Sequence, residues 1–328
     1  MNGSAIAVSG LRKTYGDQVV LGGIDFEVPE GSVFSLLGPN GAGKTTTVNI
    51  LTTLAKADAG TVRVAGHDVE TGTRDVRAAI GVTGQFAAVD ELLTGRENLR
   101  LMADLKRVRS AGRVVAGLLE RFDLAESADK PAASYSGGMR RKLDLAMTLV
   151  GTPRIIFLDE PTTGLDPRSR RTMWDIVRGL VADGTTIFLT TQYLEEADEL
   201  ADRVAVLSGG EIAAEGSPDE LKRLVPGGHV RLRFTDPAAY RSAADALRDV
   251  PADDETLSLR IPSDGSQREL RGILDWLDAA GVQADELTVH TPDLDDVFLA
   301  LTDNTRTDGR TGTDRTRTDH TRKEAIAP

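Results

Sequence analysis

The stretch Val33-Phe34-Ser35-Leu36-Leu37-Gly38-Pro39-Asn40-Gly41-Ala42-Gly43-Lys44-Thr45-Thr46 decides how the rest of the sequence is interpreted. An apolar run leads into the pattern G-x-x-x-x-G-K-[ST], and an apolar helical pattern over residues 47–54 follows it. Glycines let backbone N–H groups curl around an anion, and the N-terminus of the helix adds its dipole. We therefore predict that Gly38–Thr46 binds the β- and γ-phosphates of a nucleotide. Lys44 would add a positive charge, and the Thr45 hydroxyl is placed to bind Mg²⁺.

A second apolar strand, over residues 155–158, ends in two adjacent carboxylates, Asp159 and Glu160. In an open parallel sheet the carboxyl ends of the strands line the ligand crevice. We assign Asp159 to Mg²⁺ or its water, and Glu160 to the attacking water. Taken alone, the pair also fits a solvated acidic turn, but beside a phosphate loop the catalytic interpretation is favoured.

A third motif, Tyr135-Ser136-Gly137-Gly138-Met139-Arg140, opens another helical pattern. Ser136 fits the N-cap position, and Gly137 and Gly138 leave amides free at the N-terminus of a helix, where a second anion can bind. One phosphate cradle is already present, so the second indicates a nucleotide held by another subunit. A plain capped helix is the alternative. Arg140-Arg141-Lys142 is interpreted as a solvated helix face.

Three regions follow from the hydrophobic pattern. Up to residue 216, apolar strands alternate with helical patterns, which predicts an α/β fold with a mainly parallel sheet. Strands without helices between them over residues 6–28 predict an antiparallel β subdomain, and residues 90–150 predict a helical subdomain. Residues 217–302 predict a small α+β C-terminal domain of the split βαβ type, closed by an amphipathic helix at Leu294–Thr302. Residues 303–328 repeat Thr, Arg, Asp and Gly, which predicts a disordered tail.

The composition excludes several classes of protein. The 328 residues are enough for two domains, and the absence of cysteine excludes disulfides and thiolate-metal sites. The net charge of −12 disfavours a nucleic-acid partner. We see no signal peptide and no apolar run of the ~20 residues that a membrane-spanning helix needs. These features indicate a cytoplasmic protein.

The three motifs occur in the order and spacing of ATP-binding-cassette (ABC) ATPase domains, which the sequence resembles over residues 4–216. The resemblance implies a P-loop ATPase that binds and hydrolyses ATP with Mg²⁺. It implies that Tyr15 stacks on adenine, that Gln85 senses Mg²⁺ and the attacking water, and that Gly164-Leu165-Asp166 crosses a dimer interface. Asp166 also fits an N-cap before Pro167. The implied dimer is a head-to-tail homodimer, with each ATP between Gly38–Thr46 of one copy and Ser136–Gly138 of the other.

One position departs from the pattern of the family. Most members carry histidine where this chain has Gln192, facing the γ-phosphate. Glutamine still donates a hydrogen bond there, but it cannot carry a positive charge. Four segments resemble the ATP-binding subunits of daunorubicin/doxorubicin-resistance exporters: residues 82–85, 135–141, 190–198 and 294–302. That resemblance implies drug or antibiotic efflux through a separate integral membrane permease subunit, with the chain peripheral at the cytoplasmic face of a bacterial plasma membrane. Leu294–Thr302 would assist assembly with that subunit, pack its own domain, or do both.

Three alternatives remain at this point. The exported molecule could be a lipid, a peptide or a polysaccharide. A soluble ABC ATPase acting in DNA repair or on ribosomes is disfavoured by the single cassette and the lack of a basic arm. The third alternative is a regulatory ATPase bound to a membrane protein that is not a pump.

Overall fold

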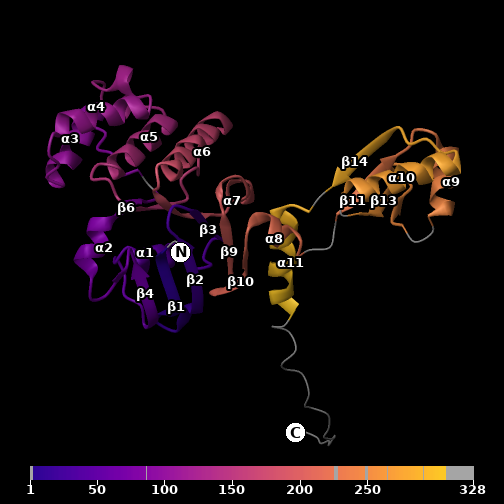
Figure 1. Ribbon diagram of the computed structural model, residues 1–328, viewed down its shortest axis with the longest axis horizontal. Coiled ribbons are helices and arrows are strands. Elements are labelled where there is room, and N and C mark those ends of the chain that lie inside the picture. The colour runs from indigo at the N-terminus through magenta and orange to yellow at the C-terminus, as the bar shows by residue number, and fades with distance from the viewer. Residues whose placement is uncertain are drawn as a thin grey trace, which may run out of the picture.

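The computed structural model describes residues 3–307 except 86, 225–227, 248–249, 264 and 291 (Figure 1). Its central sheet has six strands in the order β10-β9-β3-β8-β7-β6, and only the β9–β10 pair is antiparallel. All residues of β3, β7 and β8 are buried, as expected for parallel strands covered on both faces. The strands are β3 (Val33–Leu37), β6 (Ile80–Thr83), β7 (Ile155–Asp159), β8 (Thr186–Thr191), β9 (Arg203–Ser208) and β10 (Glu211–Gly216).

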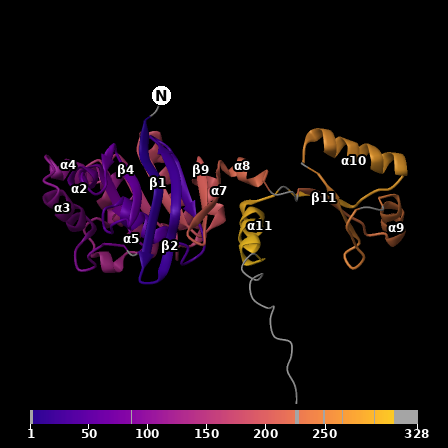
Figure 2. The ribbon, with the colours of Figure 1, turned by 90° about the horizontal axis from the view of Figure 1, so that it is seen from below.

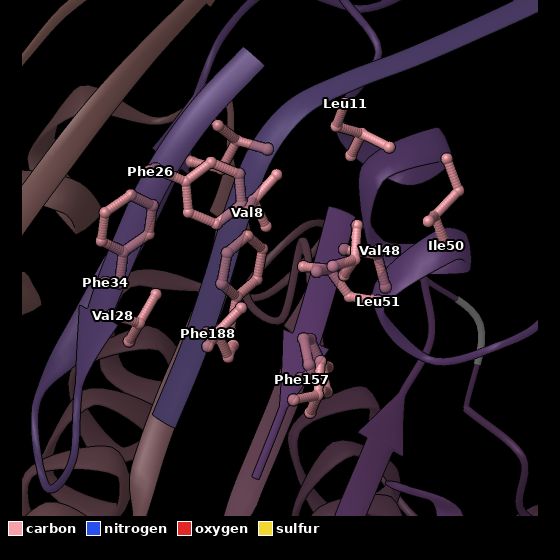
Figure 3. Packing of buried hydrophobic residues seen from close by; sticks show 14 of the residues in the cluster. Val8, Leu11, Phe26, Val28, Phe34, Val48, Ile50, Leu51, Phe157 and Phe188 are labelled. Atoms are coloured by element: carbon pink, nitrogen blue, oxygen red, sulfur yellow. The ribbon is translucent and has the colours of Figure 1, made fainter. Parts of the chain in front are cut away.

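A second, antiparallel sheet packs against the first and confirms the predicted β subdomain. Its order is β2-β1-β4-β5, formed by β1 (Ser4–Tyr15), β2 (Gln18–Pro29), β4 (Ala59–Val64) and β5 (His67–Asp68). Between the sheets, the ring of Phe26 stacks on Phe34 with centroids 5.2 Å apart, and Phe34 stacks on Phe188 at 5.6 Å (Figure 3). This aromatic core fixes β3, and hence the loop that leaves it. Two short helices, α1 (Lys44–Leu51) and α2 (Thr73–Ala79), belong to the same part of the chain.

The helical subdomain lies between β6 and β7, as predicted. It comprises α3 (Gly95–Leu105), α4 (Ala111–Arg121), α5 (Gly137–Thr148) and two 3₁₀ turns, Ala125–Ser127 and Ala132–Ser134. Thr94 and Glu97 form a capping box at the start of α3. Ser136 caps α5, where its hydroxyl accepts a hydrogen bond from the amide of Met139 at 3.2 Å. The subdomain packs on α6 (Pro167–Ala182), which Asp166 caps.

The C-terminal sheet has the order β12-β13-β11-β14. It is built in the sequence β11 (His229–Arg233), α9 (Pro237–Ala246), β12 (Ala252–Asp253), β13 (Ser258–Pro262), α10 (Gln267–Ala280) and β14 (Glu286–His290). This βαββαβ order is the split βαβ arrangement that the sequence predicts. Val230, Leu232 and Leu259 of the sheet pack with Tyr240 of α9 and Ile273 of α10.

The last helix, α11 (Leu294–Thr307), corrects one expectation. It does not close the small sheet. Leu294 and Val297 pack with Leu221 of α8 (Pro218–Lys222), Ala197 of α7 (Leu194–Leu200) and strand β9. Figures 1 and 2 both show α11 beside α8 and apart from α9 and α10. The chain therefore leaves the ATPase core after α8, forms the small sheet, and returns to the core.

The predicted tail begins later than expected, because α11 continues to Thr307. The remainder of that prediction, residues 308–328, lies outside the described residues. Among the helices that the structure describes, none is both long enough and apolar enough to span a bilayer.

Candidate nucleotide-binding site

The phosphate loop joins the end of β3 to the start of α1. Its backbone needs glycine: Gly43 has a φ of +111°, and a Cβ on Gly38 would lie 2.5 Å from the carbonyl oxygen of Leu207. Lys44 Nζ donates hydrogen bonds to the Gly38 oxygen at 2.7 Å and the Pro39 oxygen at 3.2 Å. The loop borders a cavity of about 450 Å³, lined by Val20, Asn40, Gly41, Gly43, Lys44, Thr45, Thr46, Gln85 and Glu160.

Two oxygen groups suited to Mg²⁺ meet at the edge of this loop. The Thr45 hydroxyl donates a hydrogen bond to Asp159 Oδ2 at 3.3 Å. This bond joins the first turn of α1 to the end of β7. Thr190 on the neighbouring strand β8 donates to the other carboxylate oxygen of Asp159. Mg²⁺ prefers such oxygen ligands and usually keeps only one or two protein carboxylates. The residues present therefore fit the ion.

Glu160 faces the same cavity from the turn after β7. Its Oε1 lies 3.6 Å from Lys44 Nζ, and its Oε2 lies 3.4 Å from Gln85 Nε2 and 3.3 Å from the Thr163 hydroxyl. Its φ of +49° is left-handed, which costs a non-glycine residue roughly 1–2 kcal/mol. Burial lowers the pKa of Lys44, and the carboxylates of Glu160 and Asp159 oppose that shift. The structure thus brings together Lys44, Gln85, Asp159 and Glu160.

The second predicted cradle borders a different cavity, of about 320 Å³. Gln85, Gly137, Arg140, Arg141, Thr163, Gly164 and Leu165 are among its lining residues. Ser136 and Gly137 are exposed at the start of α5. Gln85 lines both cavities, whereas the phosphate loop lines only the first. The phosphate loop and the start of α5 therefore border different cavities of one copy.

Three other predicted residues are placed less decisively. Tyr15 ends β1 with 51% of its surface exposed, and Lys13 Nζ lies 5.2 Å from the centre of its ring. Gln192 is partly buried between β8 and α7. Neither is among the residues that line the first cavity. Asp166 accepts hydrogen bonds from the amides of Arg168 and Ser169, both at 3.0 Å, so it has an evident capping role.

The sequence interpretation of Arg141 as part of a solvated face is wrong. Its side chain is 8% exposed and donates to the carbonyl oxygens of Gly84 at 2.7 Å and Pro161 at 2.8 Å. The available signal was Leu145, one turn further along the same side of α5. An apolar residue there, opposite Leu143 and Met147, indicates a helix buried on more than one side.

Comparisons with known proteins support this site. Residues 21–163 match the family model described as ABC transporter. The daunorubicin resistance ATP-binding protein DrrA3 of Streptomyces coeruleorubidus is 48% identical over 311 residues, covering 93% of this chain and 98% of that protein. The daunorubicin/doxorubicin resistance ATP-binding protein DrrA of Streptomyces peucetius is 44% identical over 333 residues, covering 98% of each chain.

Solved structures show the same cassette fold. The ATP-binding subunit of an ABC transporter superposes with a TM-score of 0.61 at 29% identity, covering 67% of this chain and 92% of that one. A dimeric cassette in a post-hydrolysis state, bound to ADP and phosphate, gives a TM-score of 0.59 at 25% identity and covers 65% and 98%. With its phosphate loop, acidic pair and near full-length relatives, the chain belongs to the ATP-hydrolysing subunits of ABC transporters, in the daunorubicin/doxorubicin-resistance family.

Proposed function

We propose that this chain powers the efflux of a drug or antibiotic through a separate integral membrane permease subunit, at the cytoplasmic face of a bacterial plasma membrane. The observation that carries the proposal is the identity to the drug-resistance relatives over nearly the whole chain. It is 48% over 93% of the chain and 44% over 98%, so it includes the small sheet and α11 outside the ATPase domain. Similarity in the small sheet and α11 is what a common permease partner would require.

The catalytic part of the proposal assigns one role to each residue of the cavity. The amides of Gly38–Thr46 and the Lys44 ammonium hold the phosphates, and Tyr15 stacks on adenine. Thr45 and Asp159, with Gln85 beside them, would hold Mg²⁺, which when bound neutralises phosphate charge. Glu160 orients the attacking water and accepts its proton, and Lys44 stabilises charge on the transferred group. Gln192 donates a neutral hydrogen bond toward the γ-phosphate.

The dimeric part of the proposal rests on the two separate cradles. Residues of Gly38–Thr46 line one cavity and Gly137 of Ser136–Gly138 lines another, so we infer that a head-to-tail homodimer places both motifs on one ATP. The dimeric cassette with ADP and phosphate supports this arrangement. In such a dimer ATP joins the two copies, and its hydrolysis releases them to switch the permease.

A second candidate is the export of a molecule other than a drug. The Nod factor export ATP-binding protein I of Burkholderia orbicola is 42% identical over 250 residues, covering 75% of this chain and 82% of that protein. A second Nod factor export ATP-binding protein I, from Paraburkholderia xenovorans, matches over 91% of this chain. Its identity is 39%, below the 48% and 44% of the two drug-resistance relatives, which favours the first candidate.

The test is a susceptibility panel in a drug-sensitive host that expresses this chain with the membrane protein encoded beside it. We expect protection against daunorubicin, doxorubicin or another antibiotic, and none when the chain carries Glu160→Gln. Protection that survives Glu160→Gln would contradict the proposal. An active ATPase that protects against no drug would favour the second candidate.

A further inference from the structure

We infer that Arg141 and Asp144 of α5 are positioning residues that hold Gln85 and Glu160 of their own chain in place. The inference rests on the proposed function, because it concerns how the proposed catalytic pair is supported. Helix α5 would then carry two things at once: the cradle for the partner's nucleotide at its first turn, and the backbone support of its own catalytic site one turn later.

Arg141 brackets Glu160 through the backbone. Its Nε donates to the carbonyl oxygen of Pro161 at 2.8 Å, and its Nη2 donates to that of Asp159 at 3.3 Å. These are the residues directly before and after Glu160, whose φ is +49°. A left-handed residue that is not glycine persists only when its surroundings fix it. The guanidinium supplies that restraint from both sides.

The same side chain and its neighbour bracket Gln85. Arg141 Nη1 donates to the carbonyl oxygen of Gly84 at 2.7 Å. One turn along the helix, Asp144 Oδ1 accepts a hydrogen bond from the amide of Ala88 at 3.0 Å. Arg141 Nη1 lies 3.4 Å from Asp144 Oδ2, which ties the two brackets together. Gln85 Nε2 in turn lies 3.4 Å from Glu160 Oε2.

The chemistry of the pair favours a positioning role over a purely stabilising one. Both side chains are less than a tenth exposed. Burial lowers the pKa of Arg141 and raises that of Asp144, so each charge is costly to bury. A buried ion pair commonly adds little to stability compared with apolar residues of the same volume. Apolar residues could not supply the planar fork of donors, which reaches the carbonyl groups of Gly84, Asp159 and Pro161.

The first experiment compares the ATPase kinetics of Arg141→Lys, Asp144→Ala and Asp144→Asn with those of the wild-type chain. Lysine keeps the positive charge but lacks the several donors of the guanidinium. We therefore expect kcat to fall by about tenfold to a hundredfold, which is the loss that a small misplacement of catalytic groups causes. The dissociation constant for a fluorescent ATP analogue should stay nearly unchanged. Asp144→Asn keeps an acceptor for Ala88 and should recover part of the activity that Asp144→Ala loses. Lys142→Ala is the matched control. Lys142 is the next residue along α5 and pairs with Asp123 instead of the catalytic loops, so this variant should behave as wild type.

Unchanged kcat in Arg141→Lys, or an equal loss of nucleotide binding, would overturn the inference. An inactive wild-type chain would instead overturn the proposed function.

Mixed dimers decide whether Arg141 acts within its own chain. One pairs Arg141→Lys with Glu160→Gln, so the working Glu160 lies in the chain that lacks the arginine. The other pairs wild type with the double variant Arg141→Lys/Glu160→Gln. Single-turnover hydrolysis should be slow in the first dimer and close to that of wild type paired with Glu160→Gln in the second. A slower second dimer would show that Arg141 serves the cradle and not the catalytic pair. Equal rates would show that Arg141 does not act within its own chain, and would also overturn the inference.

Discussion

Glu160 lies where β7 turns toward α6, within reach of Lys44, Gln85 and Thr163. Glu160→Gln keeps the shape of the side chain but cannot take a proton from water. We therefore expect normal ATP binding, a loss of hydrolysis of at least a hundredfold on the scale typical of general-base removal, and an ATP-dependent dimer on gel filtration. Glu126→Gln, at an exposed position, is the control. Elution of the Glu160 variant only as a monomer in saturating ATP would count against the shared site.

Glu196 on α7 is fully buried, and its Oε1 accepts a hydrogen bond from Trp174 Nε1 at 3.2 Å. Burial raises the pKa of Glu196 above its ordinary value of 4.5, and the bond from Trp174 opposes the shift. The folded state therefore holds this proton more tightly than the unfolded state does. Its contribution to the free energy of unfolding is present at low pH and is lost as pH rises through the raised value.

Glu196→Gln, which is neutral at every pH, should lack this dependence. The difference in unfolding free energy between variant and wild type should shift in favour of the variant as pH rises above 4.5, and level off once pH exceeds the raised pKa. Urea denaturation across that range measures it. The exposed Glu126→Gln should track the wild type, and parallel curves for all three chains would contradict the assignment to Glu196.

At the scale of elements, the sequence predicts the helix α11 correctly but predicts the wrong surface for it to pack on. The spacing of Leu294, Val297, Phe298 and Leu301 identifies an amphipathic helix and its apolar face. It does not identify the surface that covers that face, and the nearest apolar elements in the chain belong to the small sheet. The structure instead buries Leu294 and Val297 against α7, α8 and β9.

This placement predicts the effect of a charge on the two sides of α11. Val297 is fully buried, so Val297→Asp should lower the stability of the ATPase core by about 3 kcal/mol or more, as an unpaired buried charge does. Leu299, which is 58% exposed, should tolerate aspartate within about 0.5 kcal/mol. Thermal unfolding with and without ATP reports on the core. Equal effects of the two substitutions would contradict the docking of α11.

At the scale of the whole molecule, the chain leaves the ATPase core after α8 and returns to it with α11 (Figure 2). A chain that ends at Thr307 keeps this return, and one that ends at His290 does not. We expect the first to retain wild-type ATPase activity and melting temperature. The second should expose the apolar patch around Leu221 and Val206 and lose stability or solubility. A loss of activity in the first chain would give residues 308–328 a function that their composition does not predict.

The sequence by itself determined the phosphate loop, the acidic pair, the capped start of α5 and the order of most helices and strands. Each of these features is formed by residues that are contiguous in the sequence, so local geometry and periodicity decide its structure. Only the tertiary structure decided the role of Arg141, whose partners lie 20 and 57 residues away, and the docking of α11 on the core. Sequence alone indicates that a charged residue such as Arg141 in a helix is solvated, and that an apolar helix face such as that of α11 packs on elements nearby in the chain. The fold decides otherwise when it brings backbone or side chains from distant parts of the chain into contact with these residues.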